Sequence, residues 1–225
     1  MRVDLHCHTC YSRDSLSTFD ELLRHMDRRG VEVVAITDHN VIAGALAFQR
    51  RAPDRFLIGE EVKTTRGELL ALFITELVPA GLSLEETVDR IHAQGGLVGA
   101  SHPLDRLRRE AIGSEGLEAI HGQLDFLEVM NSRVILASDN RRAREKAARW
   151  GLPGSAGSDA HAPFEVGRCY AEMPHYEGAQ DFLDCLAQAQ IGGWISSPLV
   201  HFASTYAKLV RRMGRSSRNR PQGVD

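Results

Sequence analysis

Short apolar runs alternate with longer amphipathic segments along most of this chain of 225 residues. Runs rich in aliphatic and β-branched residues predict strands at 3–5, 32–37, 56–62, 68–74, 97–101, 126–130, 154–157 and 169–173. Segments with helical spacing between them predict helices at 18–29, 83–95, 136–150 and 179–190. This alternation favours an α/β fold with a parallel sheet, either open or closed into a barrel.

Capping signals fix two of the helix starts. Thr18 is followed by Glu21 and Ser83 by Glu86, the spacing with which a side-chain oxygen and a carboxylate satisfy the free N–H groups of a first turn. Gly30 ends the first of these helices, and a glycine pair ends the second. The polar motifs of the chain fall where the predicted strands end and loops begin. Both open sheets and barrels place their active sites there.

Histidine and aspartate residues gather at three strand ends. His6 and His8 occupy alternate positions, so their side chains point the same way and Cys7 points the other way. The sequences Thr37-Asp38-His39-Asn40 and Gly157-Ser158-Asp159-Ala160-His161 end two further runs. Because strand ends meet at the mouth of a barrel, these side chains predict one metal site there.

A wider search of strand ends gives the full set of candidate ligands. A single histidine at such a position is more often a hydrogen-bonded surface residue, but this set is too large for that interpretation to hold throughout. Pro103 favours an extended conformation for His102, and Asp159 shares a face with His161 if the backbone stays extended. The candidates are His6, His8, Asp14, His39, Glu61, Glu68, His102, Asp159 and His161.

Two further sets of polar residues are not candidate metal ligands. Asp4 and Asp38 neighbour candidate ligands, so we expect them to fix an imidazole tautomer by accepting a hydrogen bond. The remaining histidines show no partner pattern, and we expect them to be solvated: His25, His92, His121, His175 and His201.

Composition narrows the functional classes. The formal net charge of −3 argues against a general nucleic-acid-binding surface. We expect a cytoplasmic protein with no membrane partner, because there is no signal pattern and no apolar run near the roughly 20 residues that span a bilayer. Cys7 and Cys10 have the spacing of a redox dithiol or half of a zinc knuckle, but we expect the four cysteines to be buried thiols.

The end of the chain differs in charge from the rest. Six basic residues and no acid lie between Lys208 and Arg220. We expect one domain over residues 1–200, followed by a partly flexible basic tail over 201–225. The alternative for the tail is a weak electrostatic contact with RNA, a membrane or a phosphorylated substrate.

The order of these motifs resembles the PHP family, the polymerase and histidinol phosphatase domain, in its compact bacterial form. The resemblance rests on His6-x-His8, Asp38-His39, Glu61 after Gly59, Ser101-His102-Pro103 and the segment 157–161, and it covers roughly residues 1–200. It implies a distorted seven-stranded (β/α) barrel with two or three divalent metal ions, such as zinc, manganese or iron. No covering insert is evident between the motifs, so an open site is expected.

The resemblance also implies ligand roles. It would place His6, His8, Glu61 and Asp159 on a first metal, with Glu61 bridging to a second metal that His102 also binds. Asp14, His39 and His161 would hold a third metal. The chain departs from much of the family at Glu68, which stands near the position where a histidine usually completes the second site.

The implied activity is phosphoester hydrolysis of a small phosphorylated metabolite or nucleotide by a metal-activated hydroxide. His161 or His39 could transfer a proton. Arg13, Lys63 and Arg133 flank the motif strands and could bind phosphate, or they could be ordinary surface charge. A short nucleic acid is a further possible partner, and no oligomeric state is indicated.

Two other functions remain open. A metal-activated hydroxide also attacks carbonyl carbon, so hydrolysis of a carboxylic ester or amide is the second enzymatic interpretation. The third is a PHP module without catalysis, since a fold alone does not guarantee activity.

Overall fold

Within residues 1–213, the part of the chain that this computed structural model describes, nine strands form one sheet. Their order is β7-β6-β5-β4-β3-β2-β1-β8-β9. The strands are β1 (Arg2–Cys7), β2 (Val33–Ile36), β3 (Phe56–Thr64), β4 (Gly67–Leu72), β5 (Leu97–Ala100), β6 (Phe126–Asn131), β7 (Gly154–Gly157), β8 (Cys169–Glu172) and β9 (Gln190–Gly193).

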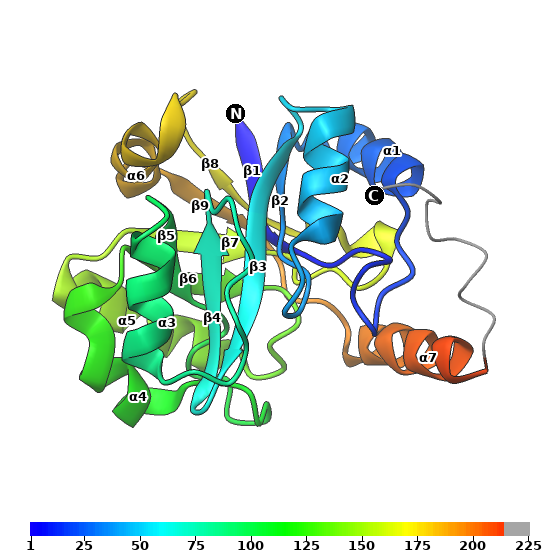
Figure 1. Cartoon of the computed structure of the whole chain (residues 1–225). Coiled ribbons are helices and arrows are strands. Elements are labelled where there is room, and N and C mark those ends of the chain that lie inside the picture. The colour runs from blue at the N-terminus through cyan, green and yellow to red at the C-terminus, as the bar shows by residue number, and fades with distance from the viewer. Residues whose placement is uncertain (214–225) are drawn as a thin grey trace.

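Helices flank this sheet. Figure 1 shows α1 and α2 on one side of it and α3, α4 and α5 on another, with α7 at the periphery. The α-helices are α1 (Phe19–Arg29), α2 (Ala43–Arg51), α3 (Leu84–His92), α4 (Gly113–Ile120), α5 (Ala137–Trp150), α6 (Gly178–Ala187) and α7 (His201–Arg212), with short 3₁₀ turns at His121–Gln123, Pro163–Glu165 and Pro198–Val200.

The first seven strands nearly close into a barrel. The end of β1 meets the residues just after β7, where the His8 N–H donates to the Ala160 carbonyl (2.9 Å) and the Asp159 N–H donates to the His6 carbonyl (2.8 Å). Strand β4 runs antiparallel to both of its neighbours, and β8 pairs antiparallel with β1. The expected distorted seven-stranded barrel is therefore confirmed, with β8 and β9 as an extension.

Local sequence explains the predicted elements. Both capping boxes are present, at Thr18 and Ser83, and α1 ends at Gly30 in the left-handed conformation with φ of 65°. Helices α2, α4 and α7 and strand β9 were not predicted. Helix α2 has no side-chain cap and α4 contains two glycines, so neither carries a clear local signal. Packing against the rest of the fold stabilises both helices.

Two apolar layers hold the barrel. The outer layer packs the helices on the sheet, and the inner layer fills one end of the barrel. On β3, β4 and β6 the inner face also carries Glu61, Glu68 and Glu128, because side chains alternate across a strand. One end of the interior is therefore apolar and the other end is polar and charged. The described part of the chain has no helix long and apolar enough to cross a membrane.

The four cysteines are free and buried, as expected. Burial raises the pKa of the Cys10 thiol to about 11 and that of Cys185 above its ordinary value. These thiols stay protonated at neutral pH and act as small apolar groups.

Gly99→Ala should destabilise the fold. A Cβ at Gly99 would lie 2.1 Å from the Phe126 ring inside the barrel, so the ring or the strand must move, at a cost of about 1–3 kcal/mol. Gly122→Ala is the matched control, because a Cβ there meets no atom within 4 Å. Urea denaturation measures both changes in unfolding free energy, and an equal effect of the two substitutions would contradict this account of the core.

Candidate metal centre

Imidazoles and carboxylates converge at the polar end of the barrel. His6 Nε2 lies 3.2 Å from His8 Nε2, so the two rings aim at one point. Glu61 faces both rings, with Oε1 3.3 Å from His6 Nε2 and Oε2 3.4 Å from His8 Nε2. Asp159 Oδ1 lies 3.3 Å from His8 Nε2. All four side chains are fully buried.

Glu61 and Glu68 together face a second pair of imidazoles. His39 Nδ1 lies 3.0 Å from Glu61 Oε2 and 3.5 Å from Glu68 Oε1. His102 Nε2 lies 3.0 Å from Glu61 Oε1 and 3.8 Å from Glu68 Oε2. The Glu68 carboxylate therefore sits between His39 and His102.

Asp14 completes the cluster from the loop after β1. Its Oδ2 lies 3.5 Å from His161 Nε2 and 3.6 Å from His39 Nε2. The structure thus brings all nine sequence-predicted ligands into one cluster. Three groups of ligand atoms each lie within 4.8 Å of one another, and these groups are His6/His8/Glu61, His39/Glu61/Glu68 and His8/His39/His161.

Unsatisfied oxygens show that the cluster fits metal ions. Glu61 Oε2, Asp159 Oδ1 and Asp14 Oδ1 are buried and have no hydrogen bond to any described residue. A buried carboxylate oxygen without a donor is costly, and a coordinated cation removes that cost. The mixed nitrogen and oxygen donors suit zinc, manganese and iron alike.

The electrostatics of the cluster favour the metal-coordinating form at Glu61 and His8 but the protonated form at His6 and His39, because burial lowers the pKa of these two imidazoles and the facing carboxylates raise it well above its usual value. Burial alone would raise the pKa of Glu61, but the facing imidazoles of His6 and His39 hold it well below its usual value. Burial lowers the pKa of His8 well below its usual value, so its ring stays neutral and keeps a lone pair. Charged carboxylates and neutral imidazoles are the forms that bind divalent ions.

Three residues around the cluster were missed by the sequence analysis. Glu128 Oε1 accepts from His6 Nδ1 (3.0 Å), which leaves His6 Nε2 free to face the cluster. Asn131 Nδ2 donates to Glu128 (3.1 Å) and to Asp159 (3.3 Å). Arg108 donates to Asp159 Oδ2 (2.7 Å). A lone glutamate in the apolar run 126–130 was the available signal for Glu128.

The roles expected for Asp4 and Asp38 are wrong. Asp4 accepts hydrogen bonds from the Ser158 and Gly167 backbone N–H groups, both at 2.8 Å. Asp38 accepts from the Thr9 N–H (2.7 Å) and the Thr9 hydroxyl. Neither carboxylate has a hydrogen bond to a ligand imidazole. They hold the loops that carry the ligands.

The backbone at two ligands departs from the extended conformation that we expected. His102 has φ of 29° and Asp159 has φ of 52°, and both values are uncommon for residues with a Cβ. Surrounding bonds hold these conformations: Glu128 accepts from the His102 N–H, and the Asp159 N–H donates to the His6 carbonyl. Strained backbone of this kind concentrates at functional sites.

A cavity of about 1070 Å³ lies in front of the cluster. Asp14, His39, Glu68 and His161 line it. The rest of its charged lining is mainly basic: two acidic residues, Asp105 and Glu110, stand against seven basic ones, which are Arg13, Lys63, Arg108, Arg109, Arg133, Lys208 and Arg211. This arrangement offers an anion several cationic groups next to the candidate metal ligands.

Helix α7, which lies within the expected tail of residues 201–225, forms one wall of this cavity, and the partial flexibility expected of the tail stays a prediction. His201, Ser204, Lys208 and Arg211 line the cavity, so His201 is also not a freely solvated surface residue. The site is walled on this side although no insert separates the motifs. The rest of the expected tail, residues 214–225, lies outside the described residues, and the boundary at residue 200 stays a prediction.

Two arginines fasten α7 across the cavity. Arg133 is only 3% exposed, and its guanidinium donates to the Val200 carbonyl (3.3 Å) and the Ser204 hydroxyl (3.0 Å). Arg211 donates to the Cys10 and Ser15 carbonyls in the loop after β1. Arg133, expected as a phosphate ligand, thus spends much of its donor capacity on α7.

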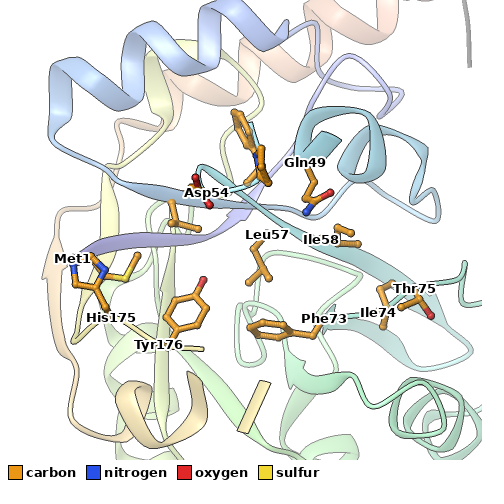
Figure 2. Close-up of a pocket in the computed structure, with 13 residues that line it drawn as sticks. Met1, Gln49, Asp54, Leu57, Ile58, Phe73, Ile74, Thr75, His175 and Tyr176 are labelled. Carbon is orange, nitrogen blue, oxygen red and sulfur yellow. The ribbon is translucent and has the colours of Figure 1, made fainter. Parts of the chain in front are cut away.

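A second cavity, of about 500 Å³, lies at the opposite end of β1, β2 and β3 (Figure 2). Leu57, Phe73 and Tyr176 form much of its wall. Its lining has one histidine, His175, and one carboxylate, Asp54, which are too few for a metal group of three. The chemistry-bearing residues are therefore concentrated at the other end of the barrel.

Comparison with known proteins matches the geometry. The family model described as PHP domain matches residues 4–98, and one described as PHP-associated matches residues 137–191. The chain is also 34% identical to the protein MJ0417 of Methanocaldococcus jannaschii over 200 residues, covering 83% of this chain and 79% of that protein. The chain belongs to the PHP family. A second relative from the same organism, MJ1587, is 38% identical over 145 residues, which cover 59% of this chain and 82% of that protein.

Solved structures share the fold of this PHP chain. A two-domain protein of Bacteroides vulgatus, which contains a predicted PHP-like metal-dependent phosphoesterase, aligns with a TM-score of 0.71 and 16% identity, over 92% of this chain and 69% of that one. An amidohydrolase of Chromobacterium violaceum, with bound sulfate and no metal, aligns with a TM-score of 0.61 and 20% identity, over 77% of this chain and 92% of that one.

Glu128→Gln should weaken metal binding without unfolding the protein. The neutral amide is a weaker partner for His6 Nδ1–H, so the His6 ring is less basic and less firmly oriented, and affinity should fall about 10–100-fold. Glu172→Gln, at an exposed carboxylate on β8, is the matched control. Competition with a chromophoric chelator measures both affinities. Unchanged affinity in Glu128→Gln would show that this hydrogen bond does not tune the site.

Proposed function

We propose that this PHP protein is a metal-dependent phosphoesterase that hydrolyses a small phosphorylated metabolite or nucleotide. The observation that carries the proposal is a buried cluster with unsatisfied carboxylate oxygens that opens into a mainly basic cavity. Phosphate esters are anionic, so they need both a nucleophile and neutralisation of charge. The cluster and the basic walls of the cavity offer these together.

The distances support Glu61 as a ligand shared between metals. Its Oε1 faces His6 and His102, whereas its Oε2 faces His8 and His39. We assign His6, His8, Glu61 and Asp159 to a first metal, Glu61, His102 and Glu68 to a second, and Asp14, His39 and His161 to a third. Glu68 supplies an oxygen beside His102 where a histidine was expected from the family pattern.

Bound divalent cations would lower the pKa of water to about 7 and neutralise charge on phosphate oxygens. Glu128 and Asn131 orient the His6 and Asp159 side chains for that task. Arg13, Lys63 and Lys208 line the cavity, and in this proposal they bind the phosphate. If it is not engaged as a metal ligand, His161 or His39 at the cavity wall could move a proton.

Hydrolysis of a carboxylic ester or amide is the second candidate, because the same metal chemistry acts on carbonyl carbon. The basic lining of the cavity favours a phosphate ester over a carboxylic ester or amide, since a neutral carbonyl substrate needs no neutralisation of charge. A module without catalysis is disfavoured because all nine candidate ligands meet in one cluster.

Hydrolysis assays on generic phosphate and carboxylate esters, a mononucleotide and a short oligonucleotide, with manganese or zinc added, test the proposal. We expect phosphoester hydrolysis, and Glu61→Gln should abolish it and lose more than one metal equivalent, because the amide cannot offset charge between two cations. Glu60→Gln is the matched control: Glu60 points to the other face of β3, and burial raises its pKa to about 7. Carboxylate-ester hydrolysis alone, or no hydrolysis with metal bound, would refute the proposal.

Lys208→Ala should weaken substrate binding more than turnover. The Lys208 ammonium lines the cavity and lies 3.4 Å from Asp14 Oδ2. Its removal would take away a charge-assisted contact with the phosphate of the substrate, so KM for a phosphate ester should rise about tenfold. Arg212→Ala, at an exposed base on the same helix that does not line the cavity, is the control. Metal analysis checks that the cluster stays loaded. Equal KM values in the two variants would place Lys208 outside the substrate site.

A further inference from the structure

Helix α7 has two faces of opposite character. The face toward the cavity is polar and carries His201, Ser204, Lys208 and Arg211. The opposite face carries an apolar stripe, which we define as Phe202, Tyr206, Leu209 and Met213. These four positions follow the spacing i, i+4, i+7 and i+11, which places them on one side of an α-helix.

More than half of the surface of each stripe residue is exposed in the described chain. Phe202 is 69% exposed, Tyr206 62%, and Leu209 and Met213 52% each, and Leu199, just before the helix, is 69% exposed. In a folded protein the apolar side of an amphipathic helix normally faces the core. Here the polar side faces the protein, so the stripe marks a surface for a further partner.

The concentration of positive charge at this end of the chain narrows the class of partner that the stripe would bind. No acidic residue occurs between Asp184 and Asp225, whereas Lys208, Arg211 and Arg212 lie on α7 and the sequence continues with Arg215, Arg218 and Arg220. The chain as a whole has a net charge of −3, so positive charge is concentrated at this end. A second copy would bring two such basic segments together, and their repulsion disfavours it.

The apolar side chains distinguish between anionic partners. A nucleic acid would stack its bases on the aromatic rings, but its binding would gain little from contacts with Leu209, Met213 and Leu199. A lipid bilayer accepts aliphatic and aromatic side chains at the boundary between headgroups and acyl chains, while flanking lysines and arginines contact anionic headgroups. Arg212 is exposed beside the stripe and suits this role.

We propose that α7 docks this protein on an anionic membrane surface, with Phe202, Tyr206, Leu209 and Met213 inserted at the interface and basic residues against the headgroups. This contact is peripheral and needs no spanning helix, so it revises the expectation of no membrane partner, which rested on the lack of such a segment. The proposal is independent of the hydrolysis proposed above. The polar face of α7 stays on the cavity while its apolar face meets the bilayer.

Co-sedimentation of the full chain with vesicles tests the docking. We expect binding to phosphatidylcholine vesicles that contain about 30% phosphatidylglycerol, much weaker binding to pure phosphatidylcholine, and loss of binding as salt screens the charges. Leu209→Ser and Phe202→Ser should each weaken binding about tenfold, because each removes an inserted apolar side chain. Leu77→Ser is the matched control, since Leu77 is 50% exposed on the loop after β4.

Three results would overturn the proposal. The first is no binding to the anionic vesicles, or equal binding to both kinds of vesicle. The second is a dimer, seen by light scattering, that Leu209→Ser dissociates, which would assign the stripe to a second copy. The third is tight binding of a short RNA that is lost in Leu209→Ser. Circular dichroism of each variant separates these outcomes from a failure to fold.

Discussion

The structure depends on the contact that joins the first strand to the residues after the seventh. Asp4 makes this contact by accepting from the Ser158 and Gly167 backbones, and Gly157 permits it, because a Cβ there would lie 2.2 Å from His6 Cβ. The closure brings His6 and His8 against Asp159 and His161. Without it the ligands of β1 and those that follow β7 would be separated by the five strands between them.

Closure also creates an electrostatic problem. It places carboxylates and imidazoles in a space without bulk water, where unpaired charge is costly. Arg108 offsets part of the charge by its 2.7 Å contact with Asp159, and it holds the pKa of that carboxylate well below its usual value although burial raises it. Glu61 Oε2, Asp159 Oδ1 and Asp14 Oδ1 have no hydrogen-bond donor among the described residues, so the cluster is suited to bound cations.

Much of this arrangement could be predicted from the sequence, because strand alternation and strand ends are local signals. The pair His6 and His8 could be predicted from the two-residue alternation of a strand, and Asp159 and His161 from their position at a strand end, although the backbone at Asp159 is not extended. Glu128 and Arg108 could not be assigned in this way, since their partners lie far away in the chain. The positive φ of His102 was hidden for a similar reason: a tertiary hydrogen bond to Glu128 overrides the preference that Pro103 imposes. Helix α7 could not be predicted from the sequence, because its contacts through Arg133 and Arg211 are made across the cavity with residues far away in the chain. Its apolar face is exposed, so the usual pattern of a buried apolar face does not apply to it.

The position of β1 has a consequence for the order of folding. Strand β1 precedes the other eight strands in the chain, yet it pairs with β8 and bridges to Ala160, both of which are made much later. Contacts of such long sequence separation form slowly, so His6 and His8 lack their partners Asp159 and His161 through most of synthesis, although β1 can pair earlier with β2. The complete cluster therefore forms last, and a nascent or truncated chain that ends before Asp159 lacks two of its nine candidate ligands, Asp159 and His161.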